Sequence, residues 1–345
     1  MDPFGIGTDS SNPTITIDLW LMDHPKFLDN PLYIAGDSYT GIVVPIIVQE
    51  IYNGNDNGNK PSMNIEGYLE GNPLTDKSSD VNSRVKFAHR VALISDELYE
   101  STKSNCHREY TDVDPNNALC VNDLQLVQES TKSNCHSEYT DVDPNNALCV
   151  NDLQLVQEED NYVYSYTWAN DRSVQNALHV REEDNYVYSY TWANDRSVQN
   201  ALHVREEWQR CNNSIHYVVG AKSSASYTFN VQSTVEYHRN LSEKRCRALI
   251  YSGDHDMVVP HEGTEEWIRS LNFPVESGWK PWFVEGQVAG SYRYTTKYAH
   301  NDYELTYATV KGAGHTAPEY KPRQCLAMVS RWFASYPLKS TLVFD

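Results

Sequence analysis

The chain has 345 residues and a formal net charge of −19, and 40% of its residues are hydrophobic. This length allows one large α/β domain or two smaller ones, and the hydrophobic fraction is ordinary for a folded protein. The acidic balance excludes a basic phosphate-binding surface, so we expect no nucleic-acid partner, and since no run of about 18 apolar residues occurs we expect no membrane span.

The front of the chain has three parts. Residues 1–13 (MDPFGIGTDSSNP) lack the basic and apolar regions of a signal peptide. Residues 14–22 (TITIDLWLM) predict a helix that ends before His24-Pro25, because the residue before a proline disfavours helical backbone; the β-branched start also permits a strand. Residues 31–35 (PLYIA) predict a short, buried parallel strand.

A second apolar run follows the first strand after a short turn. Residues 41–52 (GIVVPIIVQEIY) predict a buried helix, which Pro45 is expected to bend. Residues 53–59 are rich in glycine and asparagine and predict a surface loop.

Two tandem duplications occupy the middle of the chain. Residues 100–128 recur as 129–157 with one difference, Ser137 in place of Arg108, and residues 158–181 recur unchanged as 182–205. Two adjacent units of different length and near-identity do not make a solenoid, which needs at least about three repeats. A duplicated exon or an error in assembling the gene model explains the near-identity of the copies better. Since a packed fold has one place for each segment, we predict that one copy of each unit docks while the other bulges outward or is loosely ordered.

The cysteines and sequons point to an oxidising compartment. Cys106 and Cys120 lie fourteen positions apart in a turn-rich segment, as in an extracellular disulfide loop. Asn212 and Asn240 begin Asn-X-Ser patterns that accept glycans in secreted proteins, with chance occurrence as the alternative. The pairs Cys106-His107 and Cys135-His136 lack the ligand spacing of zinc motifs, and the duplication explains their recurrence, so we expect no metal.

The end of the chain returns to alternating strands and helices. Residues 248–252 (ALIYS) and 305–310 (LTYATV) predict buried strands, and residues 322–336 have the apolar spacing of an amphipathic helix. Strands followed by turns and helices at both ends of the chain predict an α/β fold with a mostly parallel sheet, interrupted by an inserted cap.

Three of the predicted strands end in a motif that carries a chemically useful side chain. Ser38 lies in GDSYTG (residues 36–41), where small neighbours allow a sharp strand-to-helix turn that exposes a hydroxyl; Asp256 ends GDHD, and His315 ends KGAGH. A serine hydroxyl needs a histidine to take its proton, and a carboxylate must hold that histidine in the right tautomer. The order Ser, Asp, His is that of α/β-hydrolases.

Each motif taken alone more often marks a turn or loop, but the three together favour a catalytic triad of Ser38, Asp256 and His315. Asp254 is the alternative acid. In hydrolases of this class the acid commonly stands three residues after the strand-end glycine, which favours Asp256.

With these residues identified, the chain strongly resembles the plant serine carboxypeptidase-like family, peptidase family S10. The matching stretches cover nearly the whole chain outside the second copies; they are PLYIAGDSYTGIVVPIIVQEI, GYLEGNPLTD, FAHRVALISDELYES, WANDRSVQNALHVR, ALIYSGDHDMVVPHEGTEEWIRSLNF and ATVKGAGHTAPEYKP. The resemblance implies an α/β-hydrolase fold with a helical cap, the triad above, and secreted or vacuolar residence with glycosylation and disulfides. It also implies a disulfide between Cys106 and Cys120 and a duplicate between Cys135 and Cys149.

The resemblance divides the chain into three regions. Residues 1–99 are expected to form the first part of the hydrolase core with the nucleophile, residues 100–210 the duplicated cap, and residues 211–345 the second part of the core with the aspartate and histidine. No cofactor is expected, because the triad supplies the nucleophile, the base and the orienting charge. The sequence carries no signal for an oligomeric state.

Two activities occur in this family, and both pass through an acyl-serine. Carboxypeptidases release the C-terminal residue of a peptide, whereas plant acyltransferases move an acyl group from a glucose ester to an alcohol. Carboxypeptidases usually have a glutamate before the nucleophile, whose protonated side chain helps hold the substrate carboxylate; Asp37 here is typical of the acyltransferase branch, as are ISDELYES and HDMVVP. We therefore expect an acyl-ester substrate, and a peptide substrate is the alternative. Asp37 could also be a variant residue of the turn that has no bearing on the substrate.

Family members also carry a signal peptide, several strands and a Gly-Gly-Pro-Gly-Cys turn ahead of the stretch that matches this chain's start. That turn supplies one donor of the oxyanion hole, and the N–H after the nucleophile, here on Tyr39, supplies the other; losing one donor typically costs about 100- to 1,000-fold in rate. We expect the chain to begin partway into the domain, which leaves a non-catalytic remnant or a faulty gene model as a third hypothesis. Cys211, Cys246 and Cys325 have no assigned partners.

Overall fold

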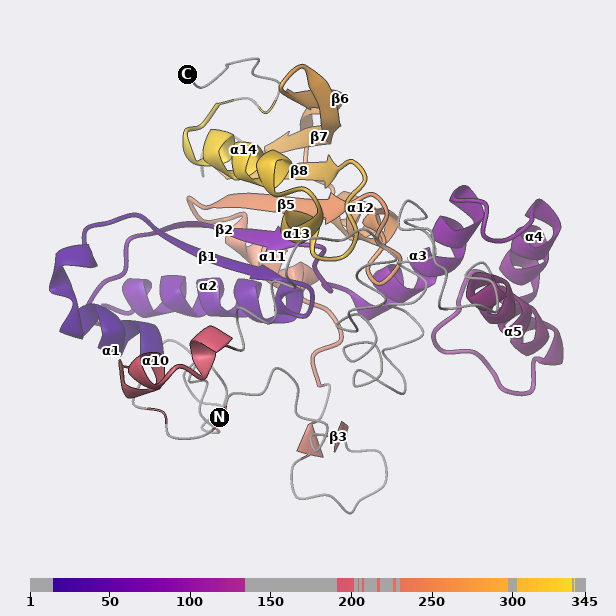
Figure 1. Cartoon of the computed structure of the whole chain (residues 1–345), viewed down its shortest axis with the longest axis horizontal. Coiled ribbons are helices and arrows are strands. Elements are labelled where there is room, and N and C mark those ends of the chain that lie inside the picture. Colours follow the sequence, from indigo (N-terminus) through magenta and orange to yellow (C-terminus); the bar gives the residue numbers. More distant parts are fainter. Residues whose placement is uncertain are drawn as a thin grey trace. The chain divides into compact units, whose positions relative to one another are not determined.

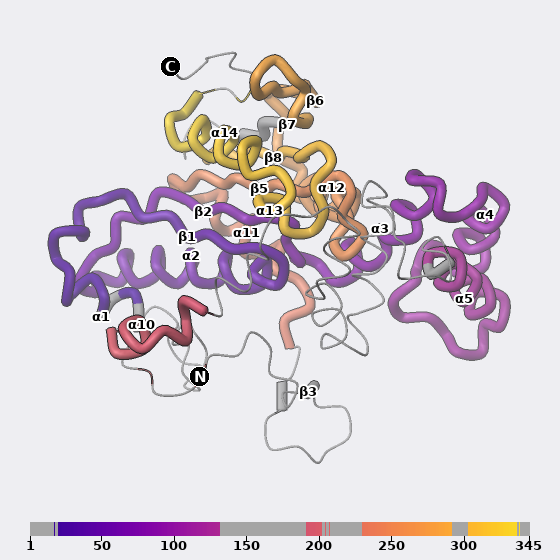
Figure 2. Tube along the Cα trace, viewed as in Figure 1, coloured from indigo at the N-terminus to yellow at the C-terminus, as the bar shows by residue number. Residues whose placement is uncertain are grey.

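The computed structural model describes residues 15–133, 191–201, 204, 207, 216–217, 226–227, 230–296, 303–336 and 338 (Figure 2). The chain divides into two compact units, residues 1–134 with 232–345, and residues 135–231. In the second unit the described elements are helix α10 (Arg196–Ala201) and a parallel pair of short strands, β3 (His216–Tyr217) and β4 (Ser226–Tyr227). None of the helices in the described ranges is long and apolar enough to cross a membrane.

A six-stranded sheet in the order β1-β2-β5-β8-β7-β6 forms the centre of the first unit (Figure 1). Its strands are β1 (Leu32–Asp37), β2 (Ile65–Gly71), β5 (Arg247–Gly253), β6 (Val275–Val284), β7 (Gln287–Thr296) and β8 (Glu304–Val310). The pairs among β1, β2, β5 and β8 are parallel, whereas β7 pairs antiparallel with both β8 and β6. This arrangement confirms the predicted mostly parallel sheet and the three strands expected from apolar runs. The burial predicted for the first of them is wrong, because β1 lies at the edge of the sheet and all its residues are at least partly exposed.

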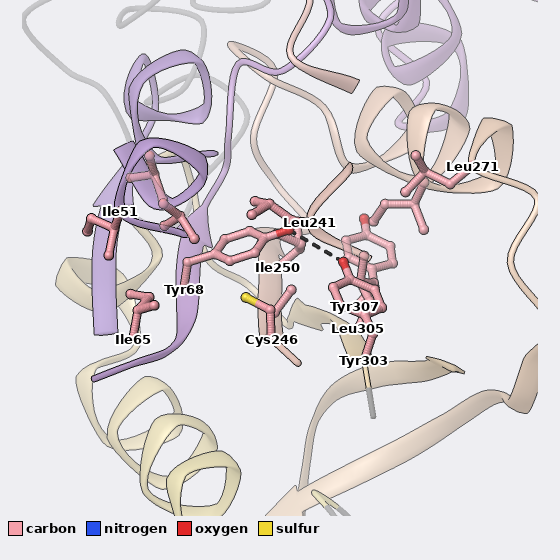
Figure 3. Close-up of a cluster of buried hydrophobic side chains, with 14 of the residues drawn as sticks. Ile51, Ile65, Tyr68, Leu241, Cys246, Ile250, Leu271, Tyr303, Leu305 and Tyr307 are labelled. Carbon is pink, nitrogen blue, oxygen red and sulfur yellow. Dashed lines mark hydrogen bonds between the residues drawn. The ribbon is translucent and has the colours of Figure 1, made fainter. Parts of the chain in front are cut away.

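Helices cover both faces of this sheet (Figure 1). Helices α2 (Thr40–Asp56), α11 (Val235–Leu241) and α12 (His261–Ser270) contribute to one core layer, and α13 (Ala317–Tyr320) and α14 (Pro322–Phe333) to the other. Successive strand residues alternate between the layers. Tyr68 and Ile250 enter the layer of α2 (Figure 3), whereas Leu69 and Tyr251 enter the layer of α14.

The remaining helices of the first unit precede the sheet or follow β2. They are α1 (Ile15–Asp23), the 3-10 helix η1 (Pro25–Phe27), α3 (Lys77–Arg90), α4 (Asp96–Asn105) and α5 (Ala118–Ser133). Helices α4 and α5 contact each other and are joined by a disulfide between Cys106 and Cys120. Helices α1 and α14 confirm the two helices predicted near the ends of the chain.

Helix α2 is longer than predicted, so the expected loop over residues 53–59 is wrong at its start. The helix continues to Asp56 despite its glycine and asparagine content. The Asn55 amide nitrogen donates to the Met63 carbonyl at 2.7 Å, and its amide oxygen accepts from the Met63 N–H at 2.9 Å. These two bonds to one neighbouring residue hold the last turn of the helix, where propensity alone favours a loop.

Pro45 lies inside α2, where it deprives the Gly41 carbonyl of its helical partner. The hydroxyl of Thr234, a fully buried residue that directly precedes α11, donates to that carbonyl at 2.8 Å. A side chain 193 positions along the chain thus replaces the missing donor. The bend predicted at Pro45 stays a prediction.

The first copy of the first duplicated unit forms much of α4, the disulfide loop and most of α5, all within the first compact unit. Helix α5 continues into residues 129–133, which already belong to the second copy. Residues 134–157 and 158–181 lie outside the described residues, as does much of 182–205. The docking of one copy per unit and the boundaries at residues 99 and 210 therefore stay predictions.

Candidate active site

Ser38 lies in the turn between β1 and α2 with φ at 60°, a left-handed conformation that is strained for a residue other than glycine. Its N–H donates to the Gly71 carbonyl at 2.9 Å, and its own carbonyl accepts from the Leu74 N–H at 2.9 Å. A methyl group at Gly36 would overlap the Thr40 side chain, so glycine is required two residues before Ser38. The turn is thereby held in a form that presents the serine hydroxyl beyond the sheet.

The three side chains singled out from the sequence form a hydrogen-bonded row. His315 Nε2 lies 2.7 Å from Ser38 Oγ, and His315 Nδ1 lies 2.8 Å from Asp256 Oδ2. The residues follow β1, β5 and β8, three parallel strands whose carboxyl ends share one edge of the sheet. A neutral imidazole with its proton on Nδ1 satisfies both contacts, since Nδ1–H donates to Asp256 and Nε2 accepts from the serine hydroxyl.

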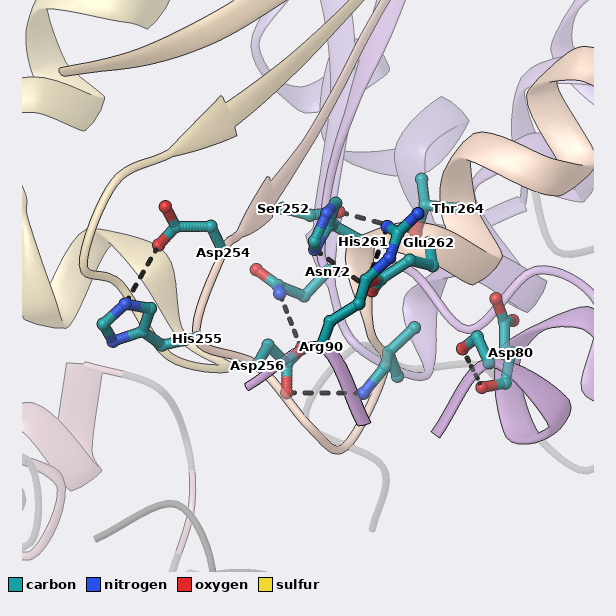
Figure 4. A network of polar contacts seen from close by, with 12 residues as sticks. Asn72, Asp80, Arg90, Ser252, Asp254, His255, Asp256, His261, Glu262 and Thr264 are labelled. Carbon is teal, nitrogen blue, oxygen red and sulfur yellow. Dashed lines mark hydrogen bonds and ion pairs between the residues drawn. The ribbon is translucent and has the colours of Figure 1, made fainter. Parts of the chain in front are cut away.

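The Asp256 carboxylate is buried, with 1% of the residue exposed, and is surrounded by donors. Besides His315, its Oδ2 accepts from Asn72 Nδ2 at 2.6 Å (Figure 4). Its Oδ1 accepts from the backbone N–H groups of Val258 at 2.8 Å and Val259 at 3.3 Å. These bonds orient the carboxylate and suit its negative charge.

Asn72 is the residue of this site that sequence reasoning missed. It directly follows β2 with φ at 40°, and its side-chain oxygen accepts from the Gly253 N–H at 3.2 Å. The sequence Asn72-Pro73 is typical of a turn, so the residue types alone do not indicate a role for the Asn72 side chain. Its position immediately after a strand, at the same edge as the other site residues, was the available signal.

Asp254, the alternative acid, has a different place. Its Oδ1 accepts from the Gly312 N–H at 2.6 Å, which ties the loop after β5 to the loop that bears His315. Asp256, and not Asp254, is the carboxylate bonded to the histidine ring.

Asp37 precedes Ser38, and its carboxyl lies close to Gly71 and Tyr251. A methyl group at Gly71 would overlap both the Asp37 carboxyl and the Tyr251 hydroxyl. Asp37 Oδ1 is buried and has no hydrogen-bond partner among the described residues. Burial raises the pKa of Asp37 to about 7, against a smaller lowering by His315. This carboxyl therefore changes charge near neutral pH beside the serine.

Tyr39 directly follows Ser38 and precedes the first residue of α2. Its peptide N–H therefore lies at the end of a long helix where the dipole favours negative charge. This is the position that the resemblance assigns to one oxyanion donor.

The other predicted site residues fall into two groups. Cys135, Cys149, Cys211 and Asn212 lie outside the described residues. Asn240 is exposed in the last turn of α11, while the hydroxyl of its sequon partner Ser242 donates to the Arg239 carbonyl at 2.6 Å.

Cys246 and Cys325 are buried free thiols, and burial raises the pKa of each to about 12. Within the described parts of the chain, no three His, Cys, Asp or Glu side chains gather closely enough to hold a metal ion.

Comparison with known proteins identifies similar sequences and a similar fold. The chain matches the serine carboxypeptidase family, Peptidase S10, over residues 9–335. The Arabidopsis thaliana protein serine carboxypeptidase-like 17 is 42% identical over 319 residues, which cover 92% of this chain and 63% of that protein. Serine carboxypeptidase-like 2 of the same plant is 41% identical over 323 residues with the same coverage. The chain thus spans about 63% of the length of these curated relatives.

A solved structure shows the same fold. The crystal structure of Kex1(Δ)p, a prohormone-processing carboxypeptidase from Saccharomyces cerevisiae, is 18% identical to the chain with a TM-score of 0.59. The match covers 94% of this chain and 66% of that one. Together with the mostly parallel sheet covered by helices, this likeness confirms the predicted α/β-hydrolase fold.

Proposed function

Because this chain belongs to the serine carboxypeptidase family, we propose that it catalyses acyl transfer through an ester formed on Ser38. The observation that carries the proposal is the row of hydrogen bonds from Ser38 through His315 to Asp256. This geometry provides a nucleophile, a base within reach of its proton, and a carboxylate that orients the base.

In the first half of the reaction, His315 Nε2 takes the hydroxyl proton as Ser38 Oγ attacks the acyl carbonyl carbon. Asp256 stabilises the imidazolium that forms, and the Tyr39 N–H donates to the oxyanion of the tetrahedral intermediate. The bond to the leaving group then breaks, and the imidazolium gives its proton to the departing oxygen or nitrogen. The acyl group remains on Ser38.

In the second half, an acceptor hydroxyl gives its proton to His315 and attacks the acyl-serine carbonyl. The bond to Ser38 Oγ breaks and the serine regains the proton. An alcohol acceptor yields a new ester, and water yields the free acid. The two activities of the family therefore differ in the acceptor and not in the triad.

We propose that the donor is an acyl glucose ester and the acceptor an alcohol. The supporting feature is Asp37, whose carboxyl lies beside the nucleophile where the resemblance expects glutamate in a peptidase. The Asp37 carboxyl is buried, and the aspartate side chain is one methylene shorter than that of glutamate. It therefore reaches less far toward the carboxylate of a peptide substrate. Ester formation from a set of glucose esters and alcohols, measured by chromatography with Ser38→Ala as control, tests this. Intact folding and labelling of Ser38 without any ester product would overturn it.

A peptidase is the second candidate, and the pKa of Asp37 near 7 favours it under acidic conditions. A protonated Asp37 can donate a hydrogen bond to the carboxylate of a peptide, whereas an ionised one repels it. Release of the C-terminal residue from blocked dipeptides at acidic pH, abolished in Ser38→Ala, would support this activity. Its absence at every pH where the protein is folded would exclude it.

We also propose that the protein resides in a secretory or vacuolar compartment. The Cys106–Cys120 disulfide supports this, since disulfides persist in oxidising compartments. A mobility shift on treatment with an N-glycosidase, reduced in Asn240→Gln, would sharpen the assignment. A reduced disulfide in protein extracted under thiol-blocking conditions would contradict it.

A further inference from the structure

We propose that Arg84 is a positioning residue for the triad, because it fixes and polarises the peptide group that donates to Asp256. This inference rests on the proposed function only for its kinetic effect, and its structural effect can be measured separately. The guanidinium lies on α3, outside the row of residues that touch the reacting atoms.

Two guanidinium nitrogens of Arg84 donate to one carbonyl oxygen. Nε lies 3.0 Å and Nη2 2.7 Å from the carbonyl oxygen of Val258. That carbonyl and the N–H of Val259 belong to the same peptide group. The Val259 N–H in turn donates to Asp256 Oδ1, as does the N–H of Val258.

The chemistry of these bonds gives Arg84 an effect on Asp256 through the peptide. Charge-assisted hydrogen bonds are about twice as strong as neutral ones, and a two-pronged guanidinium contact also fixes orientation. A peptide whose carbonyl is bound by a cation becomes a better donor at its N–H, because hydrogen bonds in a chain polarise one another. Arg84 therefore stabilises both the direction and the strength of the donors that hold the carboxylate against His315.

A second side chain on α3 binds the neighbouring loop. Asp80, one helical turn before Arg84, accepts from the backbone N–H groups of Thr75 at 2.7 Å and Asp76 at 3.0 Å. These residues follow Asn72, whose side chain is another donor to Asp256. One face of α3 thus holds both of the loops that enclose the carboxylate.

The structure offers a matched control on the same helix. Arg90 Nη1 pairs with the Glu262 carboxylate of α12 at 3.0 Å (Figure 4), and among the described residues it forms no hydrogen bond with the loop that bears Asp256. Loss of Arg90 weakens the docking of α3 on α12 without touching the donors of Asp256. A general loosening of α3 would therefore affect both arginine variants, whereas a positioning role is specific to Arg84.

The experiment compares wild type, Arg84→Gln, Arg84→Lys and Arg90→Gln in the full chain. A fluorophosphonate probe, from which Ser38 Oγ displaces fluoride at phosphorus, gives the rate constant for serine attack across a range of pH. We expect Arg84→Gln to lower this rate about 10- to 100-fold, as for a small misplacement of a catalytic group. Its pH midpoint should move to lower pH, because a loosened Asp256 supports the imidazolium less.

Arg84→Lys keeps the charge but not the two-pronged contact, so it should lie between wild type and Arg84→Gln. Arg90→Gln should retain the wild-type pH midpoint. The low-field proton resonance of His315 Nδ1–H provides a readout that needs no activity, and it should move upfield in Arg84→Gln and not in Arg90→Gln. Equal resonances and equal pH midpoints in Arg84→Gln and Arg90→Gln would overturn the inference. Absence of labelling in wild type with an Arg84-specific resonance shift would instead reject the proposed function and retain this one.

Discussion

Two buried carboxyl groups on neighbouring parts of the sheet have opposite surroundings. Asp256, in the loop after β5, accepts hydrogen bonds from two side chains and two backbone N–H groups. Glu70, in the adjacent strand β2, is fully buried, and neither of its oxygens has a hydrogen-bond partner among the described residues. Both are shielded from water, so burial alone does not distinguish them.

The neighbours of Glu70 explain why it is not a second charged site. Its Oε2 lies 3.6 Å from His238 Nε2, while His238 Nδ1 lies 2.7 Å from the Tyr68 hydroxyl. Burial raises the pKa of Glu70 well above its ordinary value and lowers that of His238 to about 3. Both shifts favour the neutral forms, so burial disfavours an ion pair between the two groups. Donors, and not depth, decide whether a buried acid can serve as a charge.

The largest test of this comparison is Asp256→Asn. The amide can no longer select the Nδ1–H tautomer of His315, and we expect about a 10⁴-fold loss in the rate of serine attack. Fluorophosphonate labelling measures it. Asp254→Asn is the matched control and should cost far less, since Asp254 contacts the Gly312 N–H and the His255 ring, whereas Asp256 is the carboxylate bonded to His315. Equal losses in the two variants would show that Asp256 has no special role.

Replacement of Glu70 should stabilise the protein, whereas replacement of Asp256 impairs its reaction. Glu70→Leu removes a buried carboxyl that lacks donors, and we expect the free energy of unfolding at neutral pH to rise by about 1–3 kcal/mol. Because the folded pKa is raised above the ordinary 4.5, the wild type loses stability as pH rises above that value. Glu70→Gln should flatten this pH dependence with little gain, which denaturant titrations at several pH values can show.

The partly buried Glu66 lies on the same strand, so Glu66→Gln is the control for a change of charge in β2. It should leave the slope of stability against pH in place. A loss of stability in Glu70→Leu would mean that hydrogen-bond donors hold the Glu70 carboxyl, and it would contradict the contrast with Asp256.

Thr234 is a buried polar group with its partner in place, so its removal should cost stability. In Thr234→Val the Gly41 carbonyl loses its donor, and we expect a loss of about 1–2 kcal/mol in urea unfolding. Pro45→Ala restores the helical N–H for that carbonyl. The loss of stability from Thr234→Val should therefore be smaller in the Pro45→Ala background. An equal loss in both backgrounds would show that the Thr234 hydroxyl does not replace the N–H that Pro45 lacks.

The smallest effect on labelling concerns Asp37, whose pKa rises from 3.8 to about 7 on folding. Its folded form binds a proton that the unfolded form releases, so it destabilises the fold progressively as pH rises through that window. Asp37→Asn should remove this part of the pH dependence and change labelling of Ser38 only a few-fold near neutral pH. An unchanged stability profile would place the Asp37 carboxyl in water.

The sequence predicted the strands that lead into the three motifs because each is an apolar run, and for two of them the run reflects burial on both faces of a parallel sheet. Strand β5 (RALIYSG) and β8 (ELTYATV) are buried from their second residue onward. Strand β6 escaped prediction because it lies at an edge, is mostly exposed and contains glycine and proline. Helix α3 has few apolar residues and lacks the pattern of a buried helix.

The residues that face the reacting atoms were easier to find than those that hold them. Ser38 and His315 lie in glycine-containing loops after apolar runs, and their chemistry is recognisable from residue type. The bonds of Asn72 and Arg84 to the Asp256 loop join segments 184 and 174 positions apart. No local pattern encodes such a distance, since it follows only from the order of strands in the sheet.

The extension of α5 across the repeat boundary shows that a unit of sequence need not be a unit of structure. The pentapeptide ESTKS occurs at residues 100–104 within α4 and again at residues 129–133 at the end of α5. The threonine of the first copy is fully buried, whereas Thr131 in the second is only partly so. The same letters are helical in both settings, so the second copy begins inside a helix that starts in the first copy. Residues on the two sides of the repeat boundary therefore share one helix, and the sequence repeat gives no structural boundary there.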